Sequence, residues 1–166
     1  MATTITLLHI GESGITVAHI GDSRIYQFRD GQIIYHTTDH SYVQSLVDLG
    51  QITKEEAAVH PQKNVITRAL MGTAHSVEAD VAFITDIQEG DIFFLCTDGV
   101  TECLSDEKLT TFFDSTVNIE SIKNKIIEHC SETSKDNFSF YLIPIQGIQK
   151  NMGYKQFLLS LFYSFA

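Results

Sequence analysis

The chain has 166 residues, of which 43% are hydrophobic and 19% are charged. This composition fits one ordinary domain and excludes a chain that is disordered along its whole length. Its 11 lysines and arginines stand against 21 aspartates and glutamates, a formal net charge of −10, which disfavours general nucleic-acid binding because phosphate backbones are repelled. No uncharged apolar stretch reaches the roughly 20 residues of a membrane-spanning helix.

The first 35 residues predict an antiparallel meander, because short runs of β-branched and apolar residues alternate with turn residues. Asp30-Gly31 is a strong hairpin signal, since both residues tolerate a positive φ. The expected strands are Thr3 to Ile10, Ile15 to Ile20, Ser23 to Phe28 and Gln32 to Tyr35.

Four helices are expected from capping residues and apolar spacing. Ser41 can cap a helix that stops near Gly50, and Thr53 with Glu56 forms a capping box for a short helix that ends before Pro61. Ser105 begins a third helix with acidic residues in its first turn. The fourth covers Ile119 to Cys130.

Strand character returns at Val65 to Leu70, Val77 to Ile84, Ile92 to Cys96 and Phe138 to Ile145. The continuous apolar run Ile92 to Cys96 predicts a strand that is buried on both faces. Strands, then helices, then strands indicate an α+β fold, with two mainly antiparallel sheets in a β-sandwich and helices outside.

The cysteines Cys96, Cys103 and Cys130 share no metal-ligand spacing and cannot all pair, and for the two of them that lie in apolar runs, buried free thiols are expected. The residues after Met1 lack the basic region of a secretory signal. Together these features favour a reducing, cytoplasmic setting.

Two aspartates follow or precede expected strands. Asp98 comes directly after Ile92 to Cys96 and Thr97, and Asp136 comes just before Phe138 to Ile145. If the two strands are neighbours, both carboxylates lie at one sheet edge, where they suit Mg²⁺ or Mn²⁺. When each motif is taken singly, the favoured interpretations are a turn or helix cap at Asp98-Gly99 and an ordinary polar loop at Asp136.

The motif Gly21-Asp22-Ser23-Arg24 lies at the junction of two strands. One interpretation is a turn in which Asp22 bonds to its own backbone, with Arg24 as an ordinary surface partner of Asp22. His40, in Asp39-His40-Ser41, is expected to be a structural hydrogen-bonding histidine. No Ser/His/Asp or Cys/His arrangement stands out, and no substrate-binding residue is identified.

The order of these motifs resembles the metal-dependent (PPM, type 2C) serine/threonine protein phosphatase family, of the bacterial type. The resemblance covers about Thr3 to Pro144 and is carried by the following segments: Gly21-Asp22-Ser23-Arg24, Asp39-His40-Ser41, Gln51 to Leu70, Thr97-Asp98-Gly99 and Asp136-Asn137. It implies a β-sandwich flanked by helices on both sides. It also implies hydrolysis of phosphoserine and phosphothreonine in a phosphoprotein substrate.

The resemblance further implies a binuclear Mg²⁺ or Mn²⁺ centre that activates a water, so that no protein nucleophile is needed. Asp98 and Asp136 correspond to ligands of one ion. Asp22 corresponds to the ligand of an additional, weaker ion, and Glu102 stands where many relatives place an acid near that ion.

The 166 residues contain no Asp-Gly-x-Gly-Gly motif, whose Asp bridges both metals in this family. Residues 1–145 are therefore interpreted as a phosphatase domain that lacks its N-terminal part, and catalysis by this chain alone is not expected. The alternative functions are a non-catalytic phosphatase-like binding module and a truncated fragment.

Residues 146–166 form a tail of different composition, rich in aromatic residues and with Lys150 and Lys155 as its charges. Phe157, Leu158, Leu161, Phe162 and Phe165 have helical spacing. One interpretation is an amphipathic helix on a membrane or a partner. Two others are a segment that covers apolar surface of the domain and an end with no selected role.

Overall fold

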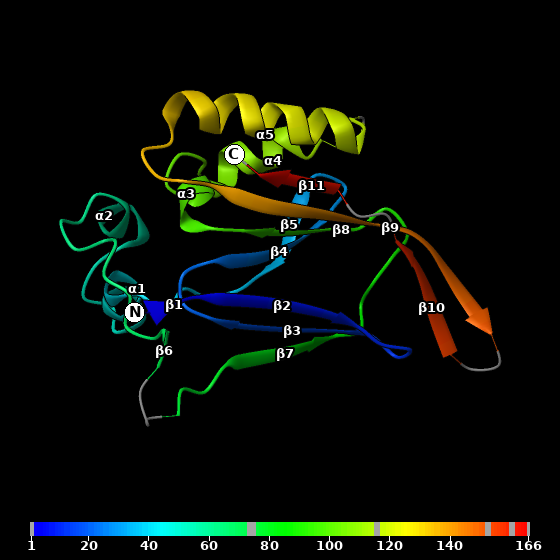
Figure 1. The fold of residues 1–166 in the computed structure, drawn as a ribbon, viewed down its shortest axis with the longest axis horizontal. Helices are drawn as coiled ribbons and strands as arrows, with labels where there is room; N and C mark the ends of the chain where they lie inside the picture. Colours follow the sequence, from blue (N-terminus) through cyan, green and yellow to red (C-terminus); the bar gives the residue numbers. More distant parts are fainter. Residues whose placement is uncertain (1, 73–75, 115–116, 152–153, 160–161, 166) are drawn as a thin grey trace.

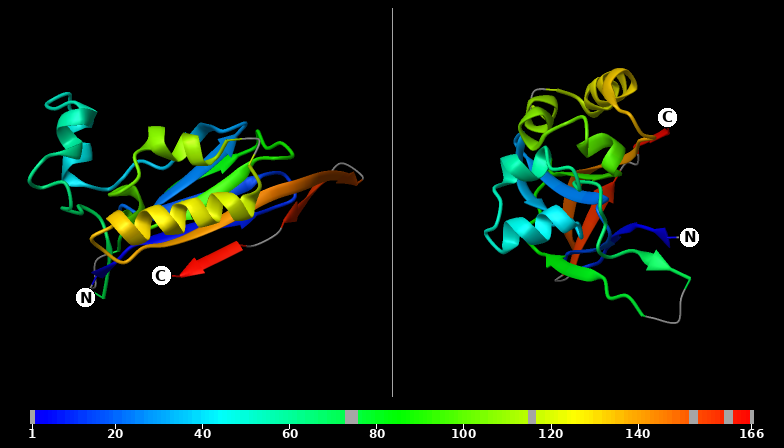
Figure 2. Two further views of the ribbon diagram at one scale, coloured as in Figure 1. Left: turned by 90° about the horizontal axis from the view of Figure 1, so that it is seen from above. Right: turned by 90° about the vertical axis from the view of Figure 1, so that its left-hand side faces the viewer.

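The computed structural model describes residues 2–72, 76–114, 117–151, 154–159 and 162–165, and these form two stacked sheets (Figures 1 and 2) and a small two-stranded sheet, in which Ala2–Thr3 pairs with Leu70–Met71. The larger sheet has the strand order β10-β9-β8-β4-β5, with β11 also paired to β9, and the smaller sheet has the order β2-β3-β7. All the strand pairs are antiparallel. The expected α+β sandwich is confirmed.

The strands are β1 (Ala2–Thr3), β2 (Ile5–Ile10), β3 (Ile15–Ile20), β4 (Arg24–Arg29), β5 (Gln32–His36), β6 (Leu70–Met71), β7 (Asp80–Ile84), β8 (Ile92–Cys96), β9 (Ser139–Asn151), β10 (Tyr154–Leu159) and β11 (Phe162–Phe165). The helices are α1 (Tyr42–Asp48), α2 (Lys54–Ala58), α3 (Asp98–Thr101), α4 (Asp106–Phe112) and α5 (Ile119–Thr133).

The neighbouring strands β4 and β8 of the larger sheet are buried on both faces, which explains the continuous apolar run of β8. One face packs against α4 and α5 in an aromatic-rich core that includes Tyr26, Phe94 and Phe113. The other packs against the smaller sheet through residues such as Ile15 and Phe93. The two cores hold β8 rigidly, so the residues that follow it start from a fixed position.

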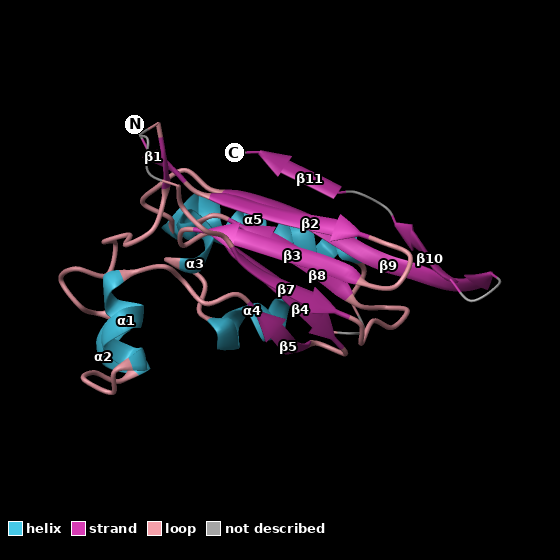
Figure 3. Ribbon diagram, turned by 90° about the horizontal axis from the view of Figure 1, so that it is seen from below, coloured by secondary structure: helices cyan, strands magenta, loops and turns pink. Residues whose placement is uncertain are grey.

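The outer face of the smaller sheet has no helix on it among the described residues (Figure 3). Ile5, Leu7, Val81 and Phe83 lie on this face and are 42–66% exposed. The family resemblance implies helices on both sides, whereas the described helices that cover a sheet face, α4 and α5, lie on the larger sheet. We call these four residues the bare face.

The turn and the helix starts that the sequence predicted from local motifs are confirmed at several positions. Asp30 and Gly31 both have positive φ values, 49° and 77°, in the turn between β4 and β5. Thr53 and Glu56 make both hydrogen bonds of a capping box. Ser41 and Ser105 each accept a backbone N–H at the start of a helix, as expected.

Two elements differ from the expectation. A strand at Val65 to Leu70 is wrong: this segment contributes one isolated bridge at Ile66, paired with Ser41, and the first residue of β6. The segment instead bonds to the residues around the start of α1, since Tyr42 N–H donates to the Val65 carbonyl and Thr67 N–H donates to the His40 carbonyl. Helix α3 was not expected, because four residues are too few to show an apolar period.

The tail also differs from the amphipathic helix considered for it. Residues 146–151 are the last part of β9. Residues 154–159 and 162–165 are strands β10 and β11, and both pair with β9, while residues 152–153, 160–161 and 166 lie outside the described part. The edge of β9 opposite β8 offers unpaired backbone groups, and an aromatic-rich segment satisfies them by adding strands.

Within the described residues, no helix combines the length and the apolarity that crossing a membrane requires.

Candidate metal centre

Strand register brings three candidate ligands to one end of the sandwich. Strand β4 pairs with β8 and β8 with β9, so that Arg24 lies opposite Cys96 and Cys96 lies opposite Phe140. Asp22 precedes β4, Asp98 follows β8 and Asp136 precedes β9. Because neighbouring strands are antiparallel, all three aspartates lie beyond the same end of the larger sheet. The sequence argument for Asp98 and Asp136 requires their strands to be neighbours, and β8 and β9 are paired.

Asp22 also lies where the chain passes between the two sheets. Strand β3 belongs to the smaller sheet and β4 to the larger one, and residues 21–23 connect them. Gly21 has a φ of +108°, and a Cβ there would lie 2.3 Å from Thr4 Cγ2. Glycine is therefore needed for both the backbone conformation and the close approach of Thr4.

Gly99 brings the loop of Asp98 against the loop of Asp136. A Cβ on Gly99 would lie 2.3 Å from the carbonyl oxygen of Asn137. The Gly99 carbonyl accepts a hydrogen bond from Ser134 Oγ at 2.8 Å, and Thr97 N–H donates to the Ser139 carbonyl at 3.0 Å. The two aspartates are thus carried by backbone segments in direct contact.

Each of these two carboxylates is oriented by the next backbone amide. Gly99 N–H donates to Asp98 Oδ1 at 2.9 Å, and Asn137 N–H donates to Asp136 Oδ1 at 2.7 Å. Glu102 lies one helical turn after Asp98, and its Oε1 lies 3.6 Å from Lys63 Nζ. Within the described residues, the side-chain hydrogen bonds of both aspartates involve Oδ1.

The carboxylates repel one another. Burial raises the pKa of Asp22, and the charge of Asp98 raises it further. Burial likewise raises the pKa of Asp98, the Gly99 amide lowers it, and the charges of Asp136 and Glu102 raise it. A divalent cation would relieve this repulsion. Oxygen-only donors of this kind suit Mg²⁺ and Mn²⁺, so the residues present fit such an ion.

Arg24 does not pair with Asp22, contrary to the sequence interpretation. Its guanidinium makes a bidentate pair with Asp39, with Nε–Oδ1 and Nη2–Oδ2 distances of 2.6 and 2.8 Å. It also donates to the hydroxyl of Tyr26, which donates in turn to Asp106. Arg24 therefore links the start of β4 to the Asp39-His40-Ser41 segment. Its guanidinium makes no salt bridge with the Asp22 carboxylate.

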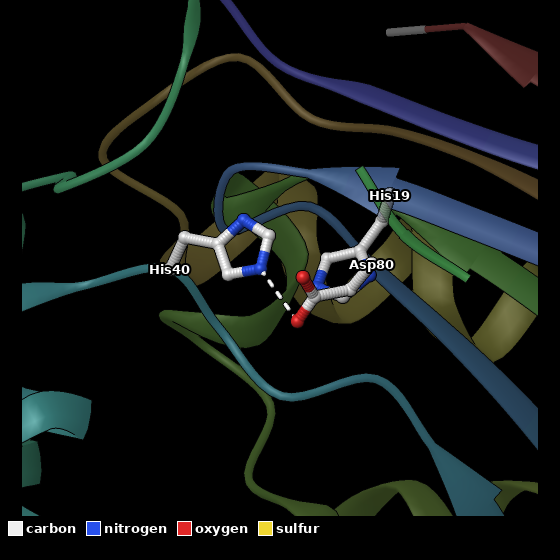
Figure 4. Close-up of side chains that lie close together, drawn as sticks. All are labelled: His19, His40 and Asp80. Atoms are coloured by element: carbon white, nitrogen blue, oxygen red, sulfur yellow. Dashed lines mark ion pairs between the residues drawn. The ribbon is translucent and has the colours of Figure 1, made fainter. Parts of the chain in front are cut away.

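A second cluster was not foreseen from the sequence. His19, His40 and Asp80 offer ligand atoms that lie within 4.8 Å of one another (Figure 4). Among the described residues, this is the one group of three histidine, cysteine or acidic side chains whose ligand atoms all lie this close together. The carboxylates of Asp22, Asp98 and Asp136 lie farther apart than that. Its members are far apart in the chain, so no local motif could reveal it.

The hydrogen bonds of His40 favour a structural role for this second cluster. His40 Nδ1 accepts the N–H of Gly21 at 3.0 Å, so the proton of the neutral ring is on Nε2, which cannot also ligate a metal. His40 Nε2 lies 3.1 Å from Asp80 Oδ2, a polar contact that is not aligned as a regular hydrogen bond. Burial lowers the pKa of His40 in spite of Asp80, which favours the neutral ring.

His40 thereby holds the backbone next to Asp22. Its own N–H donates to the Gly21 carbonyl at 3.0 Å, so one residue satisfies both backbone groups of Gly21. The expected structural hydrogen-bonding histidine is confirmed. It positions the turn that carries Asp22, and its partner Asp80 is held in turn by Arg68.

Comparison with known proteins places these features in a family. Residues 1–130 match the family model described as protein phosphatase 2C. The chain is 40% identical over 128 residues to a protein phosphatase 2C-type relative from Streptococcus pyogenes, and the match covers 77% of this chain and 51% of the relative. The chain thus spans about half the length of that relative.

Solved structures agree with this match. The serine/threonine phosphatase of S. agalactiae superposes with a TM-score of 0.77 at 38% identity, over 86% of this chain and 58% of that one. The catalytic domain of the serine/threonine protein phosphatase PstP, solved in complex with two manganese ions, gives a TM-score of 0.70 at 31% identity, over 89% of this chain and 60% of that one.

Proposed function

Because the chain belongs to the protein phosphatase 2C family, we propose that it supplies part of a divalent-metal centre that hydrolyses phosphoserine and phosphothreonine in proteins. The proposed ligands are Asp98 and Asp136 for one ion, with Asp22 and Glu102 at an additional ion. The observation that carries this proposal is the convergence of Asp22, Asp98 and Asp136 at one end of the sheet, with burial and mutual repulsion raising the pKa of Asp22 and Asp98.

Mn²⁺ or Mg²⁺ is the proposed metal, supported by the all-oxygen donor set and by the two manganese ions in the PstP relative. When bound, such ions supply Lewis-acid activation of the attacking water and neutralise charge on the phosphoryl group. The chain's own contribution is to orient the carboxylates: Gly99 and Asn137 amides fix two of them, and His40 fixes the turn of Asp22.

A phosphoprotein is the proposed substrate, by analogy with the relatives named as protein phosphatases. We also propose a reducing, cytoplasmic setting, which is supported by the three free cysteines.

The test is Mn²⁺ binding by the purified 166-residue chain, measured by calorimetry, together with hydrolysis of an aryl phosphate. We expect measurable binding that Asp98→Asn weakens at least tenfold. Asp30→Asn is the matched control, because it makes the same chemical change in the exposed turn between β4 and β5, at the far end of β4 from Asp22. We expect little hydrolysis, because the sequence contains no Asp-Gly-x-Gly-Gly segment to bridge two ions.

The outcomes separate the proposed functions. Binding without hydrolysis supports a metal-holding segment and leaves the phosphatase-like binding module as the function of this chain alone. Equal binding by Asp98→Asn and Asp30→Asn, or no binding by the unaltered chain, would refute the assigned centre. Rapid hydrolysis abolished by Asp98→Asn would show that these residues suffice for catalysis.

A further inference from the structure

Two thiols from distant parts of the chain lie in contact beside the turn that follows α3. Cys103 Sγ is 3.2 Å from Cys130 Sγ. Cys103 lies between α3 and α4, and Cys130 lies in the last part of α5. Both cysteines are free, Cys130 is 1% exposed, and Cys103 is partly exposed.

The pairing follows from how α5 packs. Ile122, Ile126 and Cys130 are four residues apart and form the buried side of this helix. Cys130 therefore faces the core, where Leu104, next to Cys103, is also buried. The sequence spacing of the two cysteines shows no motif, so their contact is visible only in the folded chain.

Two hydrogen bonds, one from α5 and one from its C-cap residue, join this helix to the segment around Cys103 on either side of the thiol pair. His129 Nε2 contacts the Cys103 carbonyl at 3.2 Å, which places an Nε2–H donor there. Ser134 Oγ donates to the Gly99 carbonyl at 2.8 Å. These bonds hold the two backbones at a fixed spacing, so that the thiols remain neighbours. A disulfide has an S–S length of about 2.05 Å, which requires the sulfurs to approach by roughly 1 Å.

We propose that Cys103 and Cys130 are an oxidative modification site, at which a hydroperoxide converts the two thiols into an intramolecular disulfide. Cys103 is the thiol that meets the oxidant, because it is partly exposed, and Cys130 is the thiol that resolves the product.

The chemistry balances in two steps. Cys103 sulfur attacks one oxygen of hydrogen peroxide, the S–O bond forms as the O–O bond breaks, and the departing hydroxide takes the thiol proton to give water. Cys130 sulfur then attacks Cys103 sulfur, the S–S bond forms as the S–O bond breaks, and hydroxide leaves with the Cys130 proton as a second water. Both sulfurs are oxidised and both peroxide oxygens are reduced; a dithiol reverses the change.

Cys96 provides the internal control. It is buried in β8 and makes no thiol contact within the described residues. An endoproteinase that cleaves before aspartate separates the three thiols: Asp98 lies between Cys96 and Cys103, and Asp114 lies between Cys103 and Cys130. Each cysteine is then in a different peptide, so mass spectrometry identifies the linked pair directly.

The experiment treats the full chain with hydrogen peroxide, blocks the remaining thiols and digests it without reductant. We expect a Cys103–Cys130 peptide pair that is lighter by two hydrogens than the sum of its parts and is released by dithiothreitol. Cys96→Ala should leave this product unchanged, whereas Cys103→Ala and Cys130→Ala should each abolish it. Because Cys103 is partly exposed, its substitution keeps the test informative if Cys130→Ala disturbs the core.

Three results would overturn the proposal: a linked peptide that contains Cys96, a disulfide between two copies of the chain on a non-reducing gel, or Cys103 oxidised to sulfinic acid while Cys130 stays reduced. None of these readouts depends on bound metal or on phosphatase activity.

Discussion

Replacing Gly99 with alanine tests whether the contact between the Asp98 and Asp136 loops shapes the candidate metal centre. The added Cβ would lie 2.3 Å from the Asn137 carbonyl oxygen and 3.2 Å from Phe138 Cβ, whereas ordinary contact begins at 3.4 Å. The two segments must therefore separate by roughly 1 Å. Overpacking of this kind costs up to about 3 kcal/mol, and alanine's helix preference in α3 returns about 1 kcal/mol. The expected net loss in unfolding free energy is about 2 kcal/mol.

Urea denaturation followed by far-ultraviolet circular dichroism measures this loss, because the chain has no tryptophan to report on unfolding. Gly72→Ala is the matched control: a Cβ there meets no described residue within 4 Å, and its effect should stay within about 0.5 kcal/mol. If Gly99→Ala and Gly72→Ala change the unfolding free energy equally, the argument from close backbone approach is wrong.

Three further substitutions test other parts of the structure. Asp98→Asn should stabilise the metal-free chain: the raised pKa means that the folded chain binds more protons than the unfolded one, so wild-type stability falls as pH rises from 3.8 through the raised pKa. Urea titrations across that range should show a flatter slope for the variant, and an unchanged slope contradicts the assignment. Asp91→Ala removes a fully buried carboxylate that pairs with Arg29, and it should lower the unfolding free energy measured in urea by about 3 kcal/mol. A loss below about 1 kcal/mol would show that the Arg29 guanidinium is not left without a partner when this carboxylate is removed. His40→Ala leaves the buried Gly21 amide without its acceptor, a loss of about 1–3 kcal/mol. It should also weaken Mn²⁺ binding, whereas unchanged affinity in the calorimetric titration would show that His40 does not position Asp22.

Much of the fold could be predicted because its signals are local. Asp30-Gly31 needs only its two neighbouring strands, and the capping box of Thr53 and Glu56 needs one turn of helix. The position of Asp98 also followed from local sequence, since the apolar run of β8 ends two residues earlier. The candidate ligands could be named for this reason, although their convergence required the pairing of β8 with β9.

The parts that could not be predicted depend on long-range packing. Arg24 could have paired with nearby Asp22, and only the fold shows that Asp39 is its partner. The contacts of His40 with Gly21 and Asp80 likewise join segments separated in sequence. The tail's aromatic residues fit a helical period, yet the unpaired edge of β9 decides in favour of strands, because backbone hydrogen bonding overrides a weak periodic pattern.

The bare face of the smaller sheet governs how the isolated chain behaves as a solute. The bare face exposes the apolar side chains of Ile5, Leu7, Val81 and Phe83 to water. The hydrophobic attraction between two such faces becomes stronger on warming from low temperature and on adding sulfate. The net charge of −10 opposes that attraction, but only over the Debye length, which shrinks from about 30 Å at 0.01 M salt to about 3 Å at 1 M. The chain should therefore stay monomeric in dilute buffer and precipitate at a low concentration of added salt. The fluorescence of a dye that binds apolar surface should rise on adding the folded chain, before any unfolding begins.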